Sequence, residues 1–407
     1  MASDISERFV WRRLTPADGY DYFFGYYDRN PWDRAIRRHL VLRAPHLTRL
    51  PLPSETAELG FTTPDGGFTP LVITRTWCHQ QGCMSLFLPW CEDSFVYNDY
   101  DDEMGMVSRL FTIGRGVVRT FEHPIYAITP DGKKAVCLDF RRIPRRGYSY
   151  ALAPLSSDRF PPDLDADGIR IMDLVTGESA VTVSYADMLR CHPARYGTEG
   201  RHIWLNHAIF NCDGSRVLWL FRTIDNVTDQ TWRTYMYTSD IRGGDAECIL
   251  PDLYWRNRGI THQIWGRTPR EILVDADWEG RGNAAVVFDE SRRPFVSREL
   301  APAWRSPSHM VFSPDGEWLL ADSCLGIDNR DRRGLLLVDP ATGNAVELGR
   351  FMMNLEPGAP GADIRTDLHP RWSRDNRYCT VDAFHDNTRG IWLLELAEAM
   401  EELREKR

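Results

Sequence analysis

Four histidines in the second half of the chain each precede an aromatic residue by three positions. They are His207 before Phe210, His262 before Trp265, His309 before Phe312 and His369 before Trp372. Imidazoles together with a carboxylate bind divalent metals such as Ca, Mn or Zn, each to a different degree. The pattern therefore predicts a metal site made by His262, His309, His369 and Asp367, with Gln263 as a further candidate. The same spacing also fits histidines whose hydrogen bonds pack neighbouring structural repeats together, and both interpretations stand.

A second group is the run from Arg141 to Tyr150, which contains four arginines and two tyrosines. Such a run of charge is usually a solvated face. A guanidinium group matches the planar geometry of a carboxylate, and a tyrosine beside a cation can transfer a proton. We therefore interpret the run as a functional loop that binds an acidic group.

A third group lies between Thr76 and Met84, where Trp77, His79, Gln80 and Gln81 directly precede a predicted strand. Polar side chains crowded at this point need hydrogen-bonding partners, which are either structural or belong to a sugar. Trp77 is one of several aromatic residues that could stack on a sugar ring, although such residues more often pack in a core.

A recurring pattern of short strands positions these residues. An apolar strand, a turn such as Pro-Asp-Gly and a second strand follow one another, most clearly at residues 128–140, 210–221, 312–322 and 372–382. The turns fall near residues 32, 92, 131, 213, 268, 315 and 375. Seven units of three or four strands predict an all-β fold, a seven-bladed β-propeller that forms a single domain over residues 1–407. Residues 144–167 supply an insertion, and residues 396–407 predict a short surface helix.

Composition excludes several classes of protein. Lys and Arg number 49 against 58 Asp and Glu, a formal charge of −9, so a nucleic-acid partner is not expected. No apolar run approaches the roughly 20 residues of a membrane span. The first residues lack the apolar segment of a signal peptide, which predicts a cytoplasmic protein. Glycine-rich phosphate-binding motifs are absent from the sequence, so no nucleotide cofactor is expected.

Several motifs together resemble the seven-bladed propeller polysaccharide lyases. These motifs lie at residues 24–32, 77–82 with 97–99, 124–132, 146–150, 206–207, 308–316 and 367–372. They resemble the ulvan lyases and rhamnosyl-glucuronate lyases, and more distantly the oligogalacturonate lyases. The resemblance implies cleavage at C4 of a uronic acid by β-elimination, with an acidic oligosaccharide as the substrate. Some relatives on this scaffold are instead rhamnosidases that use a histidine on the opposite face.

The elimination requires a neutralised carboxylate, a base for the C5 proton and an acid for the departing oxygen. The resemblance implies a His/Tyr/Arg group, and the candidates for it are Tyr150, Tyr148, His79, Arg146 and His207. Arg145 and, more distantly, Arg170 are candidates for binding the substrate carboxylate, and Gln80, Gln81, Asn98 and Trp77 for binding the sugar. In oligogalacturonate lyases the metal lies among histidines of the late blades, which here implies His309 and His369 with His262 near.

Three functions remain open from the sequence. The first is a lyase acting on glucuronate-type oligosaccharides. The second is a rhamnosidase-like glycoside hydrolase on the same scaffold. The third is a non-catalytic propeller that binds a glycan or a protein, because one fold can support many functions.

Overall fold

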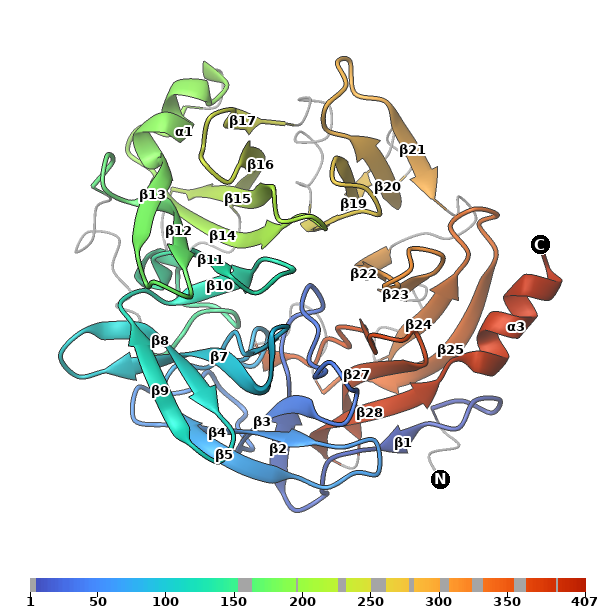
Figure 1. Ribbon diagram of the computed structural model, residues 1–407. Coiled ribbons are helices and arrows are strands. Elements are labelled where there is room, and N and C mark those ends of the chain that lie inside the picture. Colours follow the sequence, from blue (N-terminus) through green and yellow to red (C-terminus); the bar gives the residue numbers. More distant parts are fainter. Residues whose placement is uncertain are drawn as a thin grey trace.

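The computed structural model describes residues 5–152, 163–194, 197–225, 232–249, 261–277, 282–300, 307–323, 332–354, 364–385 and 387–407. Seven four-stranded antiparallel sheets stand side by side around a common axis (Figure 1). The region at the axis of a propeller is termed its central channel. This arrangement is a seven-bladed β-propeller and confirms the predicted fold class. None of the helices in these ranges is both long and apolar enough to cross a membrane.

The first three blades come from the first half of the chain. Their strands are β2 (Tyr20–Phe23), β3 (His39–Pro45), β4 (Ala57–Thr62) and β5 (Thr69–Thr74); β6 (Leu86–Leu88), β7 (Cys91–Asp101), β8 (Gly105–Thr112) and β9 (Gly116–Phe121); and β10 (Ile125–Ile128), β11 (Lys134–Cys137), β12 (Gly168–Asp173) and β13 (Ser179–Ser184). The connection from β11 to β12 contains the 3-10 helix η1 (Phe140–Arg142) and most of the expected insertion, of which residues 153–162 lie outside the described ranges. The turn expected near residue 92 lies slightly earlier, because β7 already begins at Cys91.

Three further blades follow, and the seventh closes the circle. Their strands are β14 (His202–Phe210), β15 (Arg216–Ile224), β16 (Arg233–Asp240) and β17 (Glu247–Cys248); β18 (Thr261–Trp265), β19 (Glu271–Asp277), β20 (Asn283–Asp289) and β21 (Ser297–Leu300); β22 (Pro307–Phe312), β23 (Leu319–Ser323), β24 (Arg332–Val338) and β25 (Ala345–Met352); and β26 (Arg371–Trp372), β27 (Tyr378–His385) and β28 (Thr388–Glu395). The helix α1 (Tyr185–Cys191) lies between β13 and β14.

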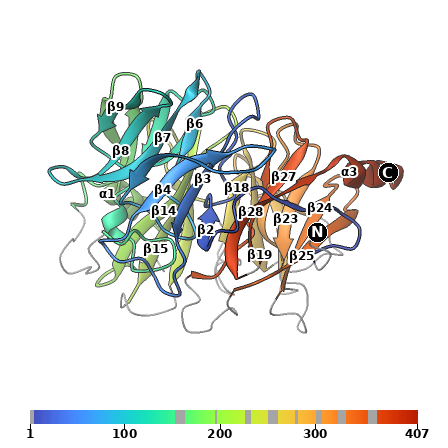
Figure 2. The same ribbon diagram turned by 90° about the horizontal axis from the view of Figure 1, so that it is seen from below.

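The N-terminal strand β1 (Arg12–Arg13) completes the seventh blade by pairing with β28. The first segment of the chain therefore closes the propeller against its last strand. Beyond β28, the helix α3 (Ala397–Glu405) packs on the outside of β24 and β25, as Figure 2 shows from the side. This helix confirms the predicted C-terminal helix, and its buried residues Met400 and Leu403 join the core of the last blades.

The recurring Asp-Gly turns join the first two strands of several blades. Gly132, Gly214 and Gly316 adopt φ values of 68°, 72° and 75°, in the left-handed region that glycine tolerates without strain. The aspartate of each turn accepts a backbone hydrogen bond from two residues further on, for example at 3.0 Å from the N–H of Lys133 to Asp131 and from the N–H of Glu317 to Asp315. These local bonds explain why the sequence pattern located the hairpins.

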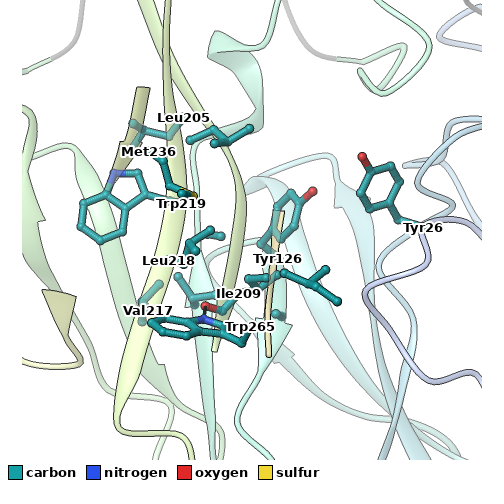
Figure 3. Packing of buried hydrophobic residues seen from close by; sticks show 14 of the residues in the cluster. Tyr26, Tyr126, Leu205, Ile209, Val217, Leu218, Trp219, Met236 and Trp265 are labelled. Atoms are coloured by element: carbon teal, nitrogen blue, oxygen red, sulfur yellow. Dashed lines mark hydrogen bonds between the residues drawn. The ribbon is translucent and has the colours of Figure 1, made fainter. Parts of the chain in front are cut away.

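Tryptophans at the ends of innermost strands connect neighbouring blades. The indole N–H of Trp265 donates to the carbonyl oxygen of Ile209 at 3.0 Å, and Figure 3 shows the two residues side by side. The indole N–H of Trp372 donates in the same way to the carbonyl oxygen of Val311 at 3.1 Å. Both tryptophans follow a histidine by three positions, so the aromatic half of the sequence pattern packs blade against blade.

We expect Trp372→Phe to lower the free energy of unfolding by about 1–3 kcal/mol, because a largely buried carbonyl oxygen loses its donor. Urea denaturation followed by circular dichroism measures the change. Trp90→Phe is the matched control, because Trp90 donates a similar 3.0 Å bond to Gly132 but is 50% exposed. The interpretation is wrong if the two variants lose equal stability.

Candidate active site

The four histidines converge inside the central channel. Ring centroids lie 4.4 Å apart between His262 and His309 and 4.3 Å apart between His309 and His369. Tyr26 bridges the remaining gap, with its ring centroid 4.8 Å from that of His369 and 4.7 Å from that of His207. We call these four histidines the histidine ring.

Irregular backbone in the innermost strands directs the ring side chains. The strand pairing shifts between Asn206 and Ile209 in β14, between Thr261 and Ile264 in β18, and between Pro307 and Met310 in β22. Each shift coincides with a ring histidine, and such bulges redirect side chains. His207, His262 and His369 also have positive φ values of 52°, 54° and 44°, which are uncommon for residues other than glycine and are frequent at functional sites.

Carboxylates on the second strands of the blades orient two ring histidines. The Nδ1–H of His309 donates to Asp322 at 2.8 Å, and the Nδ1–H of His262 donates to Asp275 at 3.3 Å. Each aspartate follows its histidine by thirteen residues. This tautomer leaves the Nε2 lone pair of each imidazole available to bind a metal ion or accept a proton.

A different hydrogen-bond chain reaches His207. The side-chain amide of Gln81 donates to the hydroxyl of Tyr126 at 2.8 Å, and this hydroxyl lies 3.0 Å from Nδ1 of His207. A hydroxyl has one proton to donate and two lone pairs that accept, so this contact is compatible with either tautomer of His207.

The loop after β2 carries Tyr26 and Tyr27 into the channel. Asp382 accepts hydrogen bonds from the backbone N–H groups of Phe24 and Gly25 at 3.3 Å, and Arg371 donates to the carbonyl oxygen of Gly25 at 2.8 Å. Gly25 has φ 131°, and a Cβ atom there would lie 2.6 Å from the backbone carbon of Gln81. The two sequence motifs that contain Gly25 and Gln81 therefore pack directly against each other.

Burial keeps His207, His309 and His369 neutral. Desolvation lowers the pKa of His207 and of His369 well below the usual value, and nearby Arg222 acts in the same direction on His207. Burial also lowers the pKa of His309, although Asp322 opposes it. Neutral imidazoles are the form that binds metals and accepts protons.

Two members of the histidine ring, His309 and His369, form with Asp367 a group that fits a divalent metal. One ligand atom from each residue lies within 4.8 Å of the others. Nε2 of His369 is buried and has no hydrogen-bond partner among the described residues. Burial alone would raise the pKa of Asp367, but Arg365 and Arg333 outweigh it and hold this pKa well below its usual range. Two neutral imidazoles and an ionised carboxylate suit Mn or Zn.

A group of arginine and aromatic side chains lies near the same part of the channel. Arg222 of β15 donates to the hydroxyl of Tyr148 at 3.3 Å, and its guanidinium carbon lies 5.5 Å from the ring centroid of Trp232. The guanidinium carbon of Arg146 lies 5.3 Å from the centroid of the same ring. Arg222 acts electrostatically on His207, Tyr26 and Tyr126. Of the residues predicted from the sequence, Tyr148 therefore contacts Arg222 directly, and Arg146 contacts the same tryptophan as Arg222.

Tyr150 and Asn98 occupy the interior between the second and third blades. Tyr150 is fully buried, stacks on Phe140 with ring centroids 4.9 Å apart, and accepts a 3.2 Å bond from Asn98. Asn98 also exchanges two 2.8 Å bonds with the backbone of Ile125. Burial raises the pKa of Tyr150 well above its usual value. These contacts connect blades, and the catalytic role of Tyr150 stays a prediction.

The residues expected from the motif at 76–84 divide into two groups. Gln81 reaches the histidine ring through Tyr126. The indole N–H of Trp77 donates to the backbone carbonyl oxygen of Glu55. His79 packs between Phe23 and Trp77, with ring centroids 5.6 and 5.3 Å away. Burial lowers the pKa of His79 well below the usual value, so this imidazole is uncharged.

Gln80 is mostly buried, and its backbone N–H donates to Gly147 at 3.3 Å. Arg145 donates to the carbonyl oxygen of Pro51, which belongs to the first blade. Arg170 donates to Ser179 at 3.3 Å and lines a separate cavity of about 640 Å³ whose described lining contains no member of the histidine ring. The structure thus brings Arg146 and Tyr148 toward the channel and places Arg145 and Arg170 elsewhere.

Several site residues were not identified from the sequence. Tyr126, Arg222 and the two orienting aspartates Asp275 and Asp322 are the main ones. The two aspartates could have been identified from the sequence, because each follows a ring histidine at the same interval. Arg222 could not, because its position depends on the register between β14 and β15.

No protein-family model matches the chain, and no curated protein has a matching sequence. Solved structures do match. One is an oligogalacturonate lyase in complex with manganese, with a TM-score of 0.64 and 15% identity over 96% of this chain and 94% of that one. Another is an oligogalacturonate lyase from Vibrio parahaemolyticus, with a TM-score of 0.62 and 14% identity over 96% of this chain and 95% of that one.

Prolyl oligopeptidase B from Galerina marginata also matches, with a TM-score of 0.53 and 11% identity over 94% of this chain and 49% of that one. Proteins with different activities thus share this arrangement of strands. At these identities the comparisons establish the fold, a propeller similar over nearly its whole length to that of the oligogalacturonate lyases.

Proposed function

We propose that this protein is a lyase that cleaves the glycosidic bond at C4 of a uronic acid in an acidic oligosaccharide, of glucuronate type, by β-elimination. The observation that carries the proposal is the histidine ring, in which Asp275 and Asp322 orient two imidazoles, placed beside Asp367 and with Arg222 close enough to act electrostatically on His207. The likeness in fold between this chain and two oligogalacturonate lyases supports the same reaction class.

The first requirement of the reaction is neutralisation of the uronate carboxylate, because the C5 proton is otherwise too weakly acidic to remove. We assign this task to the guanidinium groups of Arg222 and Arg146, with the hydroxyl of Tyr148 as a further hydrogen-bonding group. A divalent ion held by His309, Asp367 and His369 would supply additional positive charge at the carboxylate.

The second requirement is a base and an acid. We assign removal of the C5 proton to the Nε2 lone pair of His262, whose ring Asp275 orients. The electron pair of the C5–H bond then forms the C4–C5 double bond as the C4–O4 bond breaks. We assign protonation of the departing O4 to the imidazolium that His262 becomes, with His207 as a neighbouring hydrogen-bonding group. The step balances without water, because the proton taken from C5 reaches O4 and His262 returns to its neutral form.

The product of this reaction carries a double bond conjugated with the carboxylate and absorbs ultraviolet light. Incubating the protein with a panel of glucuronate- and galacturonate-containing oligosaccharides, with and without Mn²⁺, tests the proposal. We expect ultraviolet absorbance to rise with at least one substrate. New reducing ends without this rise would indicate a glycoside hydrolase, and no change with any substrate would favour a binding protein.

We expect Arg222→Ala to lower kcat/KM by about 10²–10³-fold, the usual effect of removing one preorganised charge-stabilising donor. Arg170→Ala is the matched control, since Arg170 lines the separate cavity, and it should stay within about twofold of the wild type. Initial rates of ultraviolet gain measure both variants. Equal losses in the two variants would refute the assignment of Arg222.

Two tyrosine variants test which phenol takes part. We expect Tyr148→Phe to reduce turnover by about tenfold or more, because the hydroxyl beside Arg222 is lost. Tyr150→Phe should keep its turnover and lose about 1 kcal/mol of stability, because Asn98 loses a buried acceptor. Activity and urea unfolding are measured on both. The reverse pattern would return the catalytic role to Tyr150.

Metal binding is tested without activity. We expect Mn²⁺ to bind the wild-type protein at one site in calorimetric titrations at neutral pH. His369→Ala should weaken this binding by about 100-fold or more, because a side chain that coordinates the metal directly is removed. His46→Ala is the control, since His46 lies outside the channel and pairs with Asp21 at 3.1 Å. Unchanged binding in His369→Ala would exclude this site.

A further inference from the structure

Two arginines already neutralise the carboxylates around the candidate metal site. Arg365 holds Asp367 with two nitrogens of its guanidinium group: its Nε–H donates to Oδ1 at 3.0 Å, and its Nη2 lies 3.0 Å from Oδ2. Arg333 of β24 lies between two carboxylates, with one nitrogen 3.1 Å from Asp367 and another that donates to Asp322 at 3.3 Å. Asp322 in turn orients His309. Two negative and two positive charges therefore balance beside the metal ligands.

Burial strengthens these ion pairs. The side chains of Asp322, Asp367 and Arg333 are at most 5% exposed, whereas that of Arg365 is 30% exposed. Little water screens charges in such a place, so each carboxylate interacts mainly with its arginines. Burial alone would raise the pKa of Asp367, but Arg365, followed by Arg333, lowers it well below its usual range. Asp367 is therefore ionised and paired without any metal ion.

A divalent ion bound by His309, Asp367 and His369 would consequently keep most of its positive charge. The two imidazoles are neutral, and Arg365 already compensates the charge of the one carboxylate ligand. Carboxylate partners of a metal ligand raise its basicity and strengthen metal binding, whereas a guanidinium group on a carboxylate ligand acts in the opposite direction. The ion would therefore bind weakly by itself, and its remaining charge would attract an anion.

We propose that Arg365 and Arg333 are positioning residues that make metal binding depend on the acidic substrate, so that a divalent ion and a uronate carboxylate each strengthen the binding of the other. This inference rests on the proposed function, because it uses the same metal site and the same class of substrate. The coupling is reciprocal: the factor by which the uronate tightens metal binding equals the factor by which the metal tightens uronate binding. Arginines with a purely structural role would not couple the two ligands.

The first test titrates Mn²⁺ into the full chain by calorimetry at neutral pH, with saturating glucuronate, with glucose, or with neither. We expect glucuronate to lower the Kd of Mn²⁺ by about tenfold or more. Glucose is the neutral counterpart and should leave the Kd within about twofold, because it adds no charge. Mn²⁺ titrated into glucuronate without protein corrects for complexes in solution. An unchanged Kd with glucuronate overturns the proposal.

Arg365→Gln tests the role of the charge, because Arg333 still pairs with Asp367 in this variant. We expect Arg365→Gln to bind Mn²⁺ about tenfold more tightly than the wild type without glucuronate, and to lose most of the coupling. Arg365→Lys keeps the positive charge and should stay within about threefold of the wild type. Arg350→Gln is the matched control, since Arg350 pairs with Glu347 at 2.6 Å on the outer strand β25, and it should stay within about twofold.

The variants and the wild type decide the proposal independently. Weaker Mn²⁺ binding by Arg365→Gln would overturn it, and so would Arg365→Lys binding as tightly as Arg365→Gln, because the charge would then not be the cause. If thermal unfolding shows that Arg365→Gln does not fold, the wild-type titrations with glucuronate and glucose still decide. Ultraviolet gain is measured separately, so a lyase without coupling would keep the proposed function and refute this inference alone.

Discussion

The cost of placing charge in the central channel governs the chemistry of this propeller. Removing an ionised group from water costs several kcal/mol unless a partner compensates it. The imidazoles of His207, His309 and His369 meet this constraint by staying neutral. Asp322 and Asp367 meet it by pairing with His309, Arg333 and Arg365. Positive charge in the channel therefore comes from arginines, while the imidazoles remain able to bind a metal or move protons.

The ability of the imidazoles to move protons depends on hydrogen bonds that fix their tautomers. Asp275 and Asp322 each accept the Nδ1–H of a ring histidine, so Nε2 of His262 and Nε2 of His309 each carry a lone pair, whereas Nδ1 of His207 lies beside the hydroxyl of Tyr126. An imidazole that a carboxylate holds in this way can take a proton from a substrate and return it, which is the proton transfer that an elimination reaction requires.

Much of the fold could be predicted from the sequence because its signals are local. The aspartate of an Asp-Gly turn accepts a hydrogen bond from a backbone N–H of the same turn. The aromatic residue three positions after each histidine marks the end of an innermost strand. The convergence of the histidines followed from that repetition. The positions of Arg222 and Tyr126 depend instead on strand register and on packing between blades, which no short motif encodes. The polar segment at 76–84 shows the same limit, since Gln81 reaches the ring while His79 is buried beside Trp77.

Closure of the circle through β1 and β28 has a consequence for how the site comes into being during synthesis. Tyr26 emerges from the ribosome long before His369, its neighbour at 4.8 Å. The early tyrosine loop is also anchored by Asp382 and Arg371 of the last blade. Nascent chains that lack the final blade thus have an unanchored tyrosine loop and an incomplete histidine ring. The complete site can therefore form only after the final blade has been synthesised.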